Sequence, residues 1–182
     1  MKKFIGLVAS LTIIAGVCAA VLAFVNKITA EPIAKTAYEN EQKAVKAVMP
    51  AGVATIGSVD ATAYDGVLYF MGHDANGEVI GYAAKGRDSG GYGGDIDLMV
   101  GFEKDRKTVV CYKTLSASET PGLGMKLKTP EFADQFKGKD GTSLKVLKDG
   151  GEIEAITSAT ITSRAVCRAI ADAQKKLADK GE

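Results

Sequence analysis

Four hydroxyl side chains gather in one short stretch near the C-terminal end of the 182-residue chain, those of Thr157, Ser158, Thr160 and Thr162. An amphipathic helix follows directly, predicted from apolar residues at three- and four-residue spacing between positions 165 and 177. The hydroxyls therefore lie at the positive, N–H-rich end of this helix, where a phosphate group is best held. Two interpretations stay open. Either Ser158 or Thr162 is an N-cap among ordinary turn residues, or one hydroxyl carries or binds a phosphate.

The seven residues that end at Thr160, E-A-I-T-S-A-T, resemble the flavinylation motif of the FMN-binding domains in Rnf-type and sodium-pumping quinone reductase complexes. That motif reads Asp-x-x-Ser/Thr-Gly-Ala-Thr, and a dedicated flavin transferase joins its last threonine to FMN through a phosphoester. The resemblance implies that Thr160 is the acceptor, with Ala159 beside it and Thr157 at the Ser/Thr position. Glu154 replaces the usual Asp and keeps its charge, whereas Ser158 replaces the usual Gly and adds a side chain at a tight turn.

A second stretch, S-E-T-P-G-L-G from position 118 to 124, resembles a segment of the same domains that lies against the flavin. Its glycines let the main chain come close to a flat ligand, although by residue type alone it is also a Pro-Gly turn. The resemblance implies contacts from Glu119, Thr120 and Leu123 to the flavin ring or ribityl chain. No catalytic residue or metal ligand is predicted. The predicted cofactor-binding residues are Thr157, Ser158, Ala159, Thr160, Thr162, Glu119, Thr120, Gly122, Leu123 and Gly124.

The most glycine-dense run of the chain extends from Gly86 to Gly94 and lacks the Gly-Lys-Ser/Thr ending of a nucleotide P-loop. By itself it is typical of a flexible loop. It also resembles the G-Y-G-G segment that precedes a strand in the FMN-binding family. The resemblance implies that Tyr92 and its flanking glycines shape the flavin pocket or a partner surface.

The N-terminal region predicts a membrane anchor. Phe4–Val25 holds 22 residues without a charge, and as a helix it is about 33 Å long, enough to cross a hydrocarbon core of about 30 Å. Lysines precede it in Met1–Lys3, so the N-terminus is expected in the cytoplasm. A cleaved signal peptide ending near Cys18–Ala20 is the alternative, but the apolar run is longer than an ordinary signal core. Residues 29–50 then predict a helical stalk, with Thr29 as its cap.

The remainder predicts an α+β domain with antiparallel strands and a C-terminal helix. Asn76-Gly77 between two apolar runs is a strong hairpin signal. The resulting organisation is an anchor over residues 1–28, a stalk over 29–50 and an extracytoplasmic domain over 51–182, which the resemblance implies is the FMN-binding domain. The predicted strands are Val67–Met71, Val79–Ala84, Leu98–Phe102, Thr108–Leu115 and Leu144–Leu147, with a short helix over Thr129–Phe136 capped by Thr129.

Composition argues against several classes of function. The net charge is +1 and no basic stripe appears, so nucleic-acid binding is not expected. His73 is the single histidine, which disfavours a metal site or a catalytic triad. No C-x-x-C pair or cysteine cluster is present for redox or iron–sulfur chemistry. Cys111 and Cys167 are predicted core residues, and whether they form a disulfide stays open.

The resemblance covers the whole chain and is closest to the G subunits of Rnf electron transport complexes. These complexes pass electrons between ferredoxin and NAD and couple the flow to sodium or proton translocation. The resemblance implies an electron-carrying subunit with FMN covalently attached to Thr160, and not a complete enzyme. Implied partners are other membrane subunits of the complex, the flavin transferase and the lipid bilayer. The implied location is the inner or plasma membrane, crossed once, with the FMN domain on the extracytoplasmic face.

Three alternatives remain from the sequence. The C subunit of the sodium-translocating NADH:quinone reductase shares these motifs but usually has a longer chain. A stand-alone membrane-anchored FMN-binding or regulatory module would hold the flavin without passing electrons in a complex. In a purely structural anchored domain without cofactor, Thr160 would be a capping residue.

Overall fold

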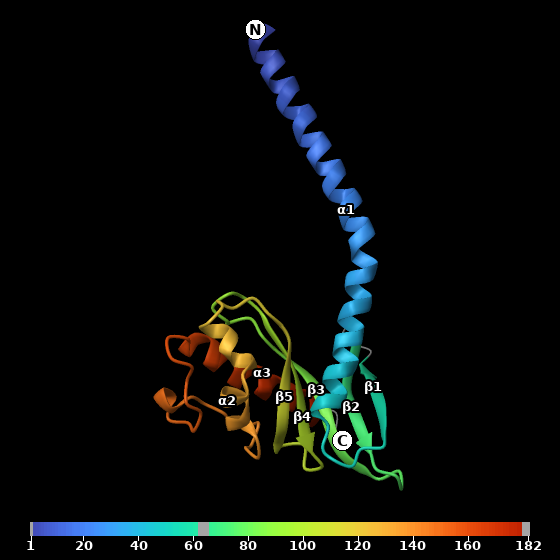
Figure 1. The fold of residues 1–182 in the computed structure, drawn as a ribbon, viewed down its shortest axis with the longest axis vertical. Helices are drawn as coiled ribbons and strands as arrows, with labels where there is room; N and C mark the ends of the chain where they lie inside the picture. Colours follow the sequence, from blue (N-terminus) through green and yellow to red (C-terminus); the bar gives the residue numbers. More distant parts are fainter. Residues whose placement is uncertain (1, 62–65, 180–182) are drawn as a thin grey trace. The chain divides into compact units, whose positions relative to one another are not determined.

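The structure is a computed structural model that describes residues 2–61 and 66–179 (Figure 1). Contacts divide the chain into two compact units, Met1–Asn40 and Glu41–Glu182. Some residues used in the sequence predictions lie outside the described residues. They are Met1, which precedes the predicted anchor, and positions 62–65 and 180–182 of the predicted domain.

Helix α1 spans Lys2–Val48. Its residues up to Asn40 belong to the N-terminal unit, and its last turns belong to the second unit. Its large apolar side chains, from Phe4 to Ile33, are exposed where the structure describes them, and α1 is long and apolar enough to cross a membrane. The prediction of one long apolar N-terminal helix is confirmed. The predicted cap at Thr29 is wrong, because α1 is continuous there and the Thr29 hydroxyl donates to the Val25 carbonyl at 2.9 Å.

The second unit contains a five-stranded sheet in which neighbouring strands are antiparallel and follow chain order. The antiparallel α+β prediction is therefore confirmed. The predicted Asn76-Gly77 hairpin joins the second and third strands, and the Asp74 carboxylate accepts backbone N–H groups of Asn76 and Glu78 at 2.8 Å. The first strand was not predicted from the sequence. The strands are β1 (Thr55–Ala61), β2 (Gly66–His73), β3 (Val79–Asp88), β4 (Ile96–Glu103) and β5 (Val109–Ala117).

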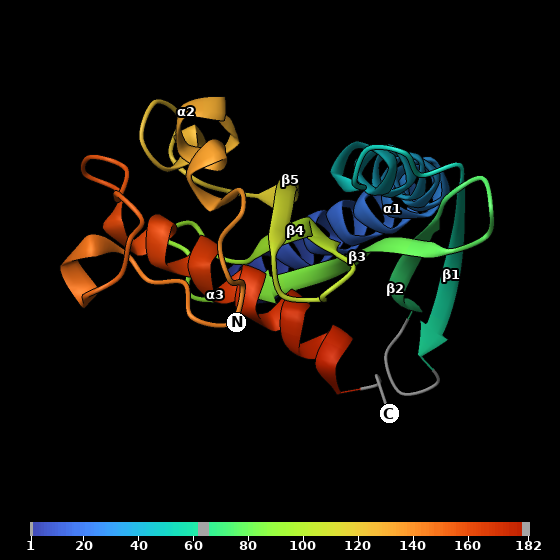
Figure 2. The ribbon, with the colours of Figure 1, turned by 90° about the horizontal axis from the view of Figure 1, so that it is seen from below.

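The C-terminal helix and the last turns of α1 pack against the two faces of the sheet, and Figure 2 shows the C-terminal helix lying along one of them. The C-terminal helix α3 (Thr160–Ala178) packs its apolar face against Leu98, Val100 and Phe102 of β4, forming the main core. On the other face, Ala44, Val45 and Val48 from the last turns of α1 pack with Phe70, Ala83 and Met99. These last turns belong to the domain core, although the sequence pattern assigned them to the stalk.

Two glycines allow this close packing of helices on strands. A β-carbon at Gly86 would lie 1.9 Å from the Ala169 carbonyl oxygen of α3, and one at Gly101 would lie 1.8 Å from the Val48 carbonyl oxygen of α1. Any side chain at either position would force the helix away from the sheet. Gly86 pairs with Leu98 of β4, so it belongs to β3 and not to the loop that its glycine-dense surroundings predicted.

The segment between β5 and α3 is built from short helical turns, namely η1 (Gly124–Lys128), α2 (Pro130–Ala133), η2 (Asp134–Phe136) and η3 (Leu147–Asp149). The predicted helix over 129–136 is present as α2 and η2, with Thr129 at the predicted N-cap position. The Thr129 hydroxyl makes no capping bond, however, and donates instead to the Lys126 carbonyl at 2.8 Å. The predicted strand at Leu144–Leu147 is wrong. Only a single bridge joins Val146 to Ile153 there, because no neighbouring strand lies alongside in the described chain.

The two cysteines of the domain lie on opposite faces of the sheet, and both thiols are free. Cys167 is buried in the main core under α3, and burial raises the pKa of its thiol to about 12. Cys111 packs against the cluster formed by the end of α1, and its partial burial also raises its thiol pKa. The sheet between them separates the two side chains.

Candidate functional site

A cavity of about 510 Å³ lies at the N-terminus of α3. It is lined by Tyr92, Glu119, Thr120, Leu123, Gly124, Ser158, Ala159, Thr160, Ile161 and Thr162. Three segments that are distant in sequence thus converge: the glycine-dense loop, the S-E-T-P-G-L-G segment and the stretch of hydroxyls. Of the ten residues predicted from the sequence, all line this cavity except Thr157 and Gly122.

The helix N-terminus in this cavity has no side-chain cap. α3 begins at Thr160, and its N-cap residue Ala159 makes no capping bond. The predicted caps are wrong, because Ser158 precedes the N-cap and the Thr162 hydroxyl donates to Glu119 instead. Among the residues that the structure describes, the backbone N–H groups of Thr160, Ile161 and Thr162 have no acceptor. These N–H groups form a site at which an anion is favoured.

The chain enters this helix through a tight turn at Ser158. Its φ is +63°, in the left-handed region that favours glycine, and the Ala159 N–H donates to the Ile156 carbonyl at 2.9 Å across the turn. A second serine then fixes the turn to the helix. The Ser163 hydroxyl donates to the Ala159 carbonyl and accepts the Ile156 N–H, both at 2.9 Å. The backbone conformation accounts for the glycine that the related motif has at position 158.

Glu119 joins the three segments around the cavity. Only 6% of Glu119 is exposed, and its carboxylate accepts the Thr162 hydroxyl at 2.8 Å and the Gly93 N–H at 3.3 Å. Two glycines leave room for it: a β-carbon at Gly91 or Gly124 would lie 2.8 or 2.4 Å from a carboxylate oxygen. The carboxylate thus holds the glycine-dense loop and the start of α3 against its own segment.

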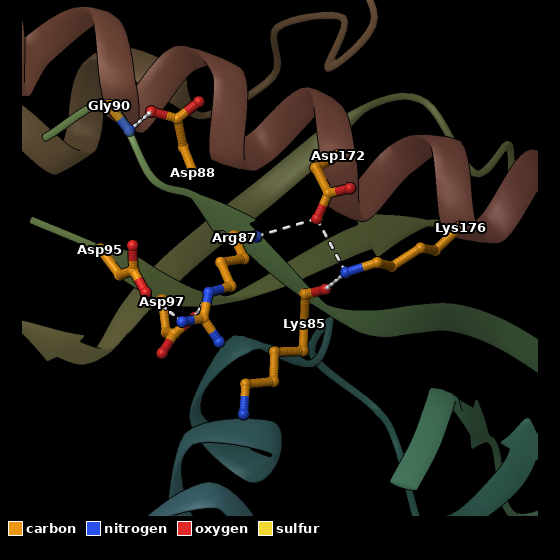
Figure 3. Close-up of polar contacts among 8 residues, drawn as sticks. All are labelled: Lys85, Arg87, Asp88, Gly90, Asp95, Asp97, Asp172 and Lys176. Carbon is orange, nitrogen blue, oxygen red and sulfur yellow. Dashed lines mark hydrogen bonds and ion pairs between the residues drawn. The ribbon is translucent and has the colours of Figure 1, made fainter. Parts of the chain in front are cut away.

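The loop that carries Tyr92 is held against α3 by hydrogen bonds at its first residues. The Asp88 carboxylate receives two hydrogen bonds of 2.8 Å from the Arg168 guanidinium of α3 and one of 2.9 Å from the Gly90 N–H. The Arg168 guanidinium holds the pKa of Asp88 below its usual value. Figure 3 shows the Asp88–Gly90 contact beside α3. The run predicted to be a flexible loop is therefore tied to the helix that supplies Thr160.

Ion pairs also join the two ends of the same loop. Arg87 of β3 pairs with Asp95, just before β4, and with Asp97 of β4 (Figure 3). Nearby, two side chains of α3 bind the backbone of β3. Asp172 accepts the Arg87 N–H and Lys176 donates to the Lys85 carbonyl, each at 2.9 Å. None of these residues was predicted from the sequence. Their only signal was the i,i+4 spacing of Asp172 and Lys176, which suits a helix-surface pair.

The two predicted residues that lie outside the cavity belong to its surroundings. Thr157 is exposed and lines a neighbouring cavity of about 300 Å³, beside Gln135 and Glu154. Gln135 holds this region in place, because its amide accepts the Glu154 N–H at 2.7 Å. Gly122 has a φ of +76° and forms the turn that follows Pro121. A turn of this kind suits the Pro-Gly pair predicted from the sequence.

The rim of the cavity is apolar. Tyr92 is 72% exposed, Leu123 42% and Ile161 49%, and each comes from a different segment. Large exposed apolar side chains that gather around a concave site indicate a surface for a ligand or a partner. Free N–H groups at one end and apolar side chains at the rim suit a flat aromatic molecule that carries a phosphate.

Comparison with known proteins agrees with this geometry. Residues 91–175 match the FMN-binding domain family, and this range includes the cavity residues. The G subunit of the ion-translocating oxidoreductase complex of Methanosarcina acetivorans is 33% identical over 93% of this chain and 92% of its own length. This chain belongs to the family of G subunits of ion-translocating oxidoreductase complexes. The family predicted from the sequence is confirmed.

Other G subunits are also similar. One is the G subunit of the Na⁺-translocating ferredoxin:NAD⁺ oxidoreductase complex of Acetobacterium woodii, which is 31% identical to this chain. The match covers 86% of this chain and 83% of the length of that subunit. Among solved structures, the C subunit of the Na⁺-translocating NADH-quinone reductase from Parabacteroides distasonis has a TM-score of 0.50 at 21% identity. It covers 69% of this chain and 76% of its own, and this likeness concerns the fold alone.

Proposed function

We propose that this G subunit is the membrane-anchored electron carrier of an ion-translocating ferredoxin:NAD⁺ oxidoreductase complex, with FMN attached to Thr160. Two relatives that match over most of the chain are named as G subunits, one of an ion-translocating oxidoreductase complex and one of a Na⁺-translocating ferredoxin:NAD⁺ oxidoreductase complex. The chain also has the FMN-binding domain. The observation that carries the proposal is the position of Thr160. It is the first residue of α3, it lines the cavity and it lies among the free N–H groups of the helix start.

The residues of the cavity fit FMN. The N–H groups of Thr160, Ile161 and Thr162 stabilise the phosphate charge, with the dipole of a 19-residue helix behind them. Tyr92 and Leu123 offer apolar surface to the ring, which is the planar part of the ligand. Thr120, Gly122 and Gly124 shape the segment that faces it. When bound, FMN supplies the capacity to accept and donate electrons, while the protein orients the ring and tunes its potential.

The link to FMN is a phosphoester from the Thr160 hydroxyl oxygen. In this step the Thr160 oxygen bonds to the flavin phosphorus, the bond from that phosphorus to the leaving group of the flavin donor breaks, and the hydroxyl proton leaves with that group. The net addition to the protein is FMN less one water, and a flavin transferase carries out the step. Thr157, Ser158 and Ala159 present Thr160 at the tight turn before the helix. A covalent link suits a domain outside the cytoplasm, since a diffusible cofactor there would be lost. The protein serves as one electron-carrying subunit of a larger assembly and not as a complete enzyme.

α1 anchors the protein in the inner or plasma membrane. By length and composition it is able to cross the hydrocarbon core once. The lysines before the apolar run support a topology with the N-terminus in the cytoplasm and the FMN domain on the extracytoplasmic face. The partners are the bilayer, the flavin transferase and the other membrane subunits of the complex.

Intact mass of the protein from its native membrane, followed by peptide mapping, tests this function. The expected result is one FMN less water on the peptide that contains Thr160, together with co-purification of multispanning membrane subunits. An unmodified Thr160 peptide in native protein would overturn the covalent assignment. A flavinylated protein that purifies alone from mild detergent would overturn its place in a complex.

A further inference from the structure

The outer edge of the sheet at β5 is free over most of its length. β5 is the last strand in the sheet and pairs with β4 on one side only (Figure 1). At its beginning the edge is covered, because Val109 exchanges backbone hydrogen bonds with Gly138 and Lys139 at 2.8 and 2.9 Å. From residue 110 to 117, no backbone hydrogen bond reaches any described residue other than those of β4. An edge of this kind is a template for another strand.

The free edge contains a short regular segment. Register shifts interrupt the β4–β5 pairing at Gly101/Phe102 and at Asp97/Leu98. Between them, the residues from Cys111 to Thr114 pair with β4 without interruption. In an antiparallel ladder every second residue directs its N–H and C=O to the outer side. The register shifts at either end limit an added strand to this length and protect the rest of the edge.

A groove of about 680 Å³ follows this segment, with residues 110–114 of β5 as its floor. One wall is formed by Ala47 in the last turn of α1 and by Met49 just after it. The other wall is formed by η1, α2, η2 and the following Lys137. The second wall is firmly held, because the Tyr112 hydroxyl donates to the Leu127 carbonyl at 2.5 Å and its ring packs edge-to-face on Phe136 at 5.5 Å. All of these residues lie in the second compact unit. A groove with rigid walls and a backbone edge in its floor suits an extended polypeptide.

The charge of the groove is positive. Lys113, Lys128 and Lys137 line it together with a single acid, Asp134. Lys137 forms an ion pair with Asp134 at 2.8 Å. Lys113 and Lys128 form no ion pair with the described part of the chain and remain available to an incoming carboxylate. The groove therefore favours an acidic segment over a basic one.

We propose that an extended acidic segment of another subunit binds in this groove and adds to the sheet beside β5. Backbone hydrogen bonds to the segment Cys111–Thr114 supply affinity, and Lys113 and Lys128 select carboxylate side chains. This inference rests on the proposed function, since it needs the protein to be a subunit of an assembly. The groove is separate from the FMN cavity, because the two share no lining residue.

Site-specific photocrosslinking in native membranes tests the docking site. A photoreactive amino acid replaces Lys113 in the full-length protein, and a matched variant carries it at Lys148, which is exposed on η3 away from the groove. The expected result is an adduct from position 113 to another subunit, mapped to a segment rich in Asp and Glu. An adduct to lipid, to a second copy of this chain or to no protein would overturn the proposal.

A charge reversal provides a second test that does not depend on the photoreactive group. Lys113→Glu with Lys128→Glu is expected to lower co-purification with the other subunits at least about tenfold, because like charges then face each other. The control is Lys145→Glu with Lys148→Glu, whose positions do not line the groove. Equal loss in both variants, or loss in neither, would contradict the inference. The mass of the Thr160 peptide is measured in the same samples, so failure of the proposed flavinylation is seen separately.

Discussion

The Thr162 hydroxyl donates a 2.8 Å hydrogen bond to the buried Glu119 carboxylate, although 43 positions separate the two residues. This bond joins the start of α3 to the S-E-T-P-G-L-G segment. The same carboxylate holds the Gly93 N–H of the loop that carries Tyr92. The shape of the cavity around Thr160 therefore depends on one acidic side chain whose chief contacts are within the protein.

Replacing Glu119 tests this arrangement. Glu119→Ala is expected to lower the free energy of unfolding by about 2–4 kcal/mol, because two hydrogen bonds to a charged group are lost in a buried place. Glu119→Gln retains an acceptor for Gly93 and is expected to cost about 1 kcal/mol. Urea unfolding of the detergent-solubilised protein measures both. Additive effects of Glu119→Ala and Thr162→Val in the double variant would show that the pair does not interact.

Thr160→Ala is expected to abolish covalent FMN while changing the free energy of unfolding by less than about 0.5 kcal/mol. The Thr160 side chain makes no hydrogen bond to the described residues, so its removal leaves packing intact. In-gel flavin fluorescence and peptide mass detect the modification. Thr157→Ala serves as the comparison and is expected to reduce attachment less, since Thr157 lies outside the cavity. Covalent flavin in the Thr160 variant would refute the assignment.

Ser158→Gly is expected to stabilise the protein by about 0.5–1 kcal/mol, because glycine adopts the φ of +63° without strain. Covalent attachment at Thr160 should be retained, since the turn keeps its geometry. Thermal or urea unfolding measures the gain. Ser143→Gly is a matched control at an exposed position with negative φ and is expected to destabilise slightly. A loss of stability in the Ser158 variant equal to that of the control would argue against strain at the turn.

The Asp88–Arg168 pair predicts a contribution to stability that depends on pH. Hydrogen bonds from Arg168 lower the folded-state pKa of Asp88 below its ordinary value of 3.8. The contribution is therefore fully present above that value and is lost as the pH falls through the folded-state pKa. Asp88→Asn should destabilise the protein at pH 7 by about 0.5–1 kcal/mol, because Arg168 is half exposed.

Urea midpoints of wild type and Asp88→Asn, measured from pH 7 down to pH 3, check this dependence. The difference between the two proteins should shrink toward acid, since protonated Asp88 resembles the variant. Other carboxyl groups with lowered pKa values, such as Asp149 beside Arg164, affect both proteins equally and cancel in the difference. A difference that stays constant over the whole range would show that the Asp88 charge contributes nothing.

Local patterns in the sequence were sufficient for much of this protein. The apolar run after Met1–Lys3, the three- and four-residue periodicity of α3 and the Asn76-Gly77 hairpin each depend on neighbouring residues, and the structure contains all three elements. Two further stretches, E-A-I-T-S-A-T and S-E-T-P-G-L-G, likewise indicated the family and most of the residues that line the cavity. They could be recognised in the sequence because each motif is continuous in the chain.

Only the tertiary structure decided the features that depend on residues far apart. In the described chain α3 has no side-chain cap, because its N-cap residue is Ala159 and the nearby Thr162 hydroxyl binds Glu119. Gly86 pairs with Leu98 of β4, and its lack of a side chain lets α3 approach the backbone of β3. β1 was not predicted from the sequence, and a strand at Leu144–Leu147 was wrongly predicted. Both errors arise because a strand needs a neighbouring strand, which the propensity of its residues does not reveal. The free edge of β5 is likewise a property of strand order in the sheet, which the interactions of the whole chain determine.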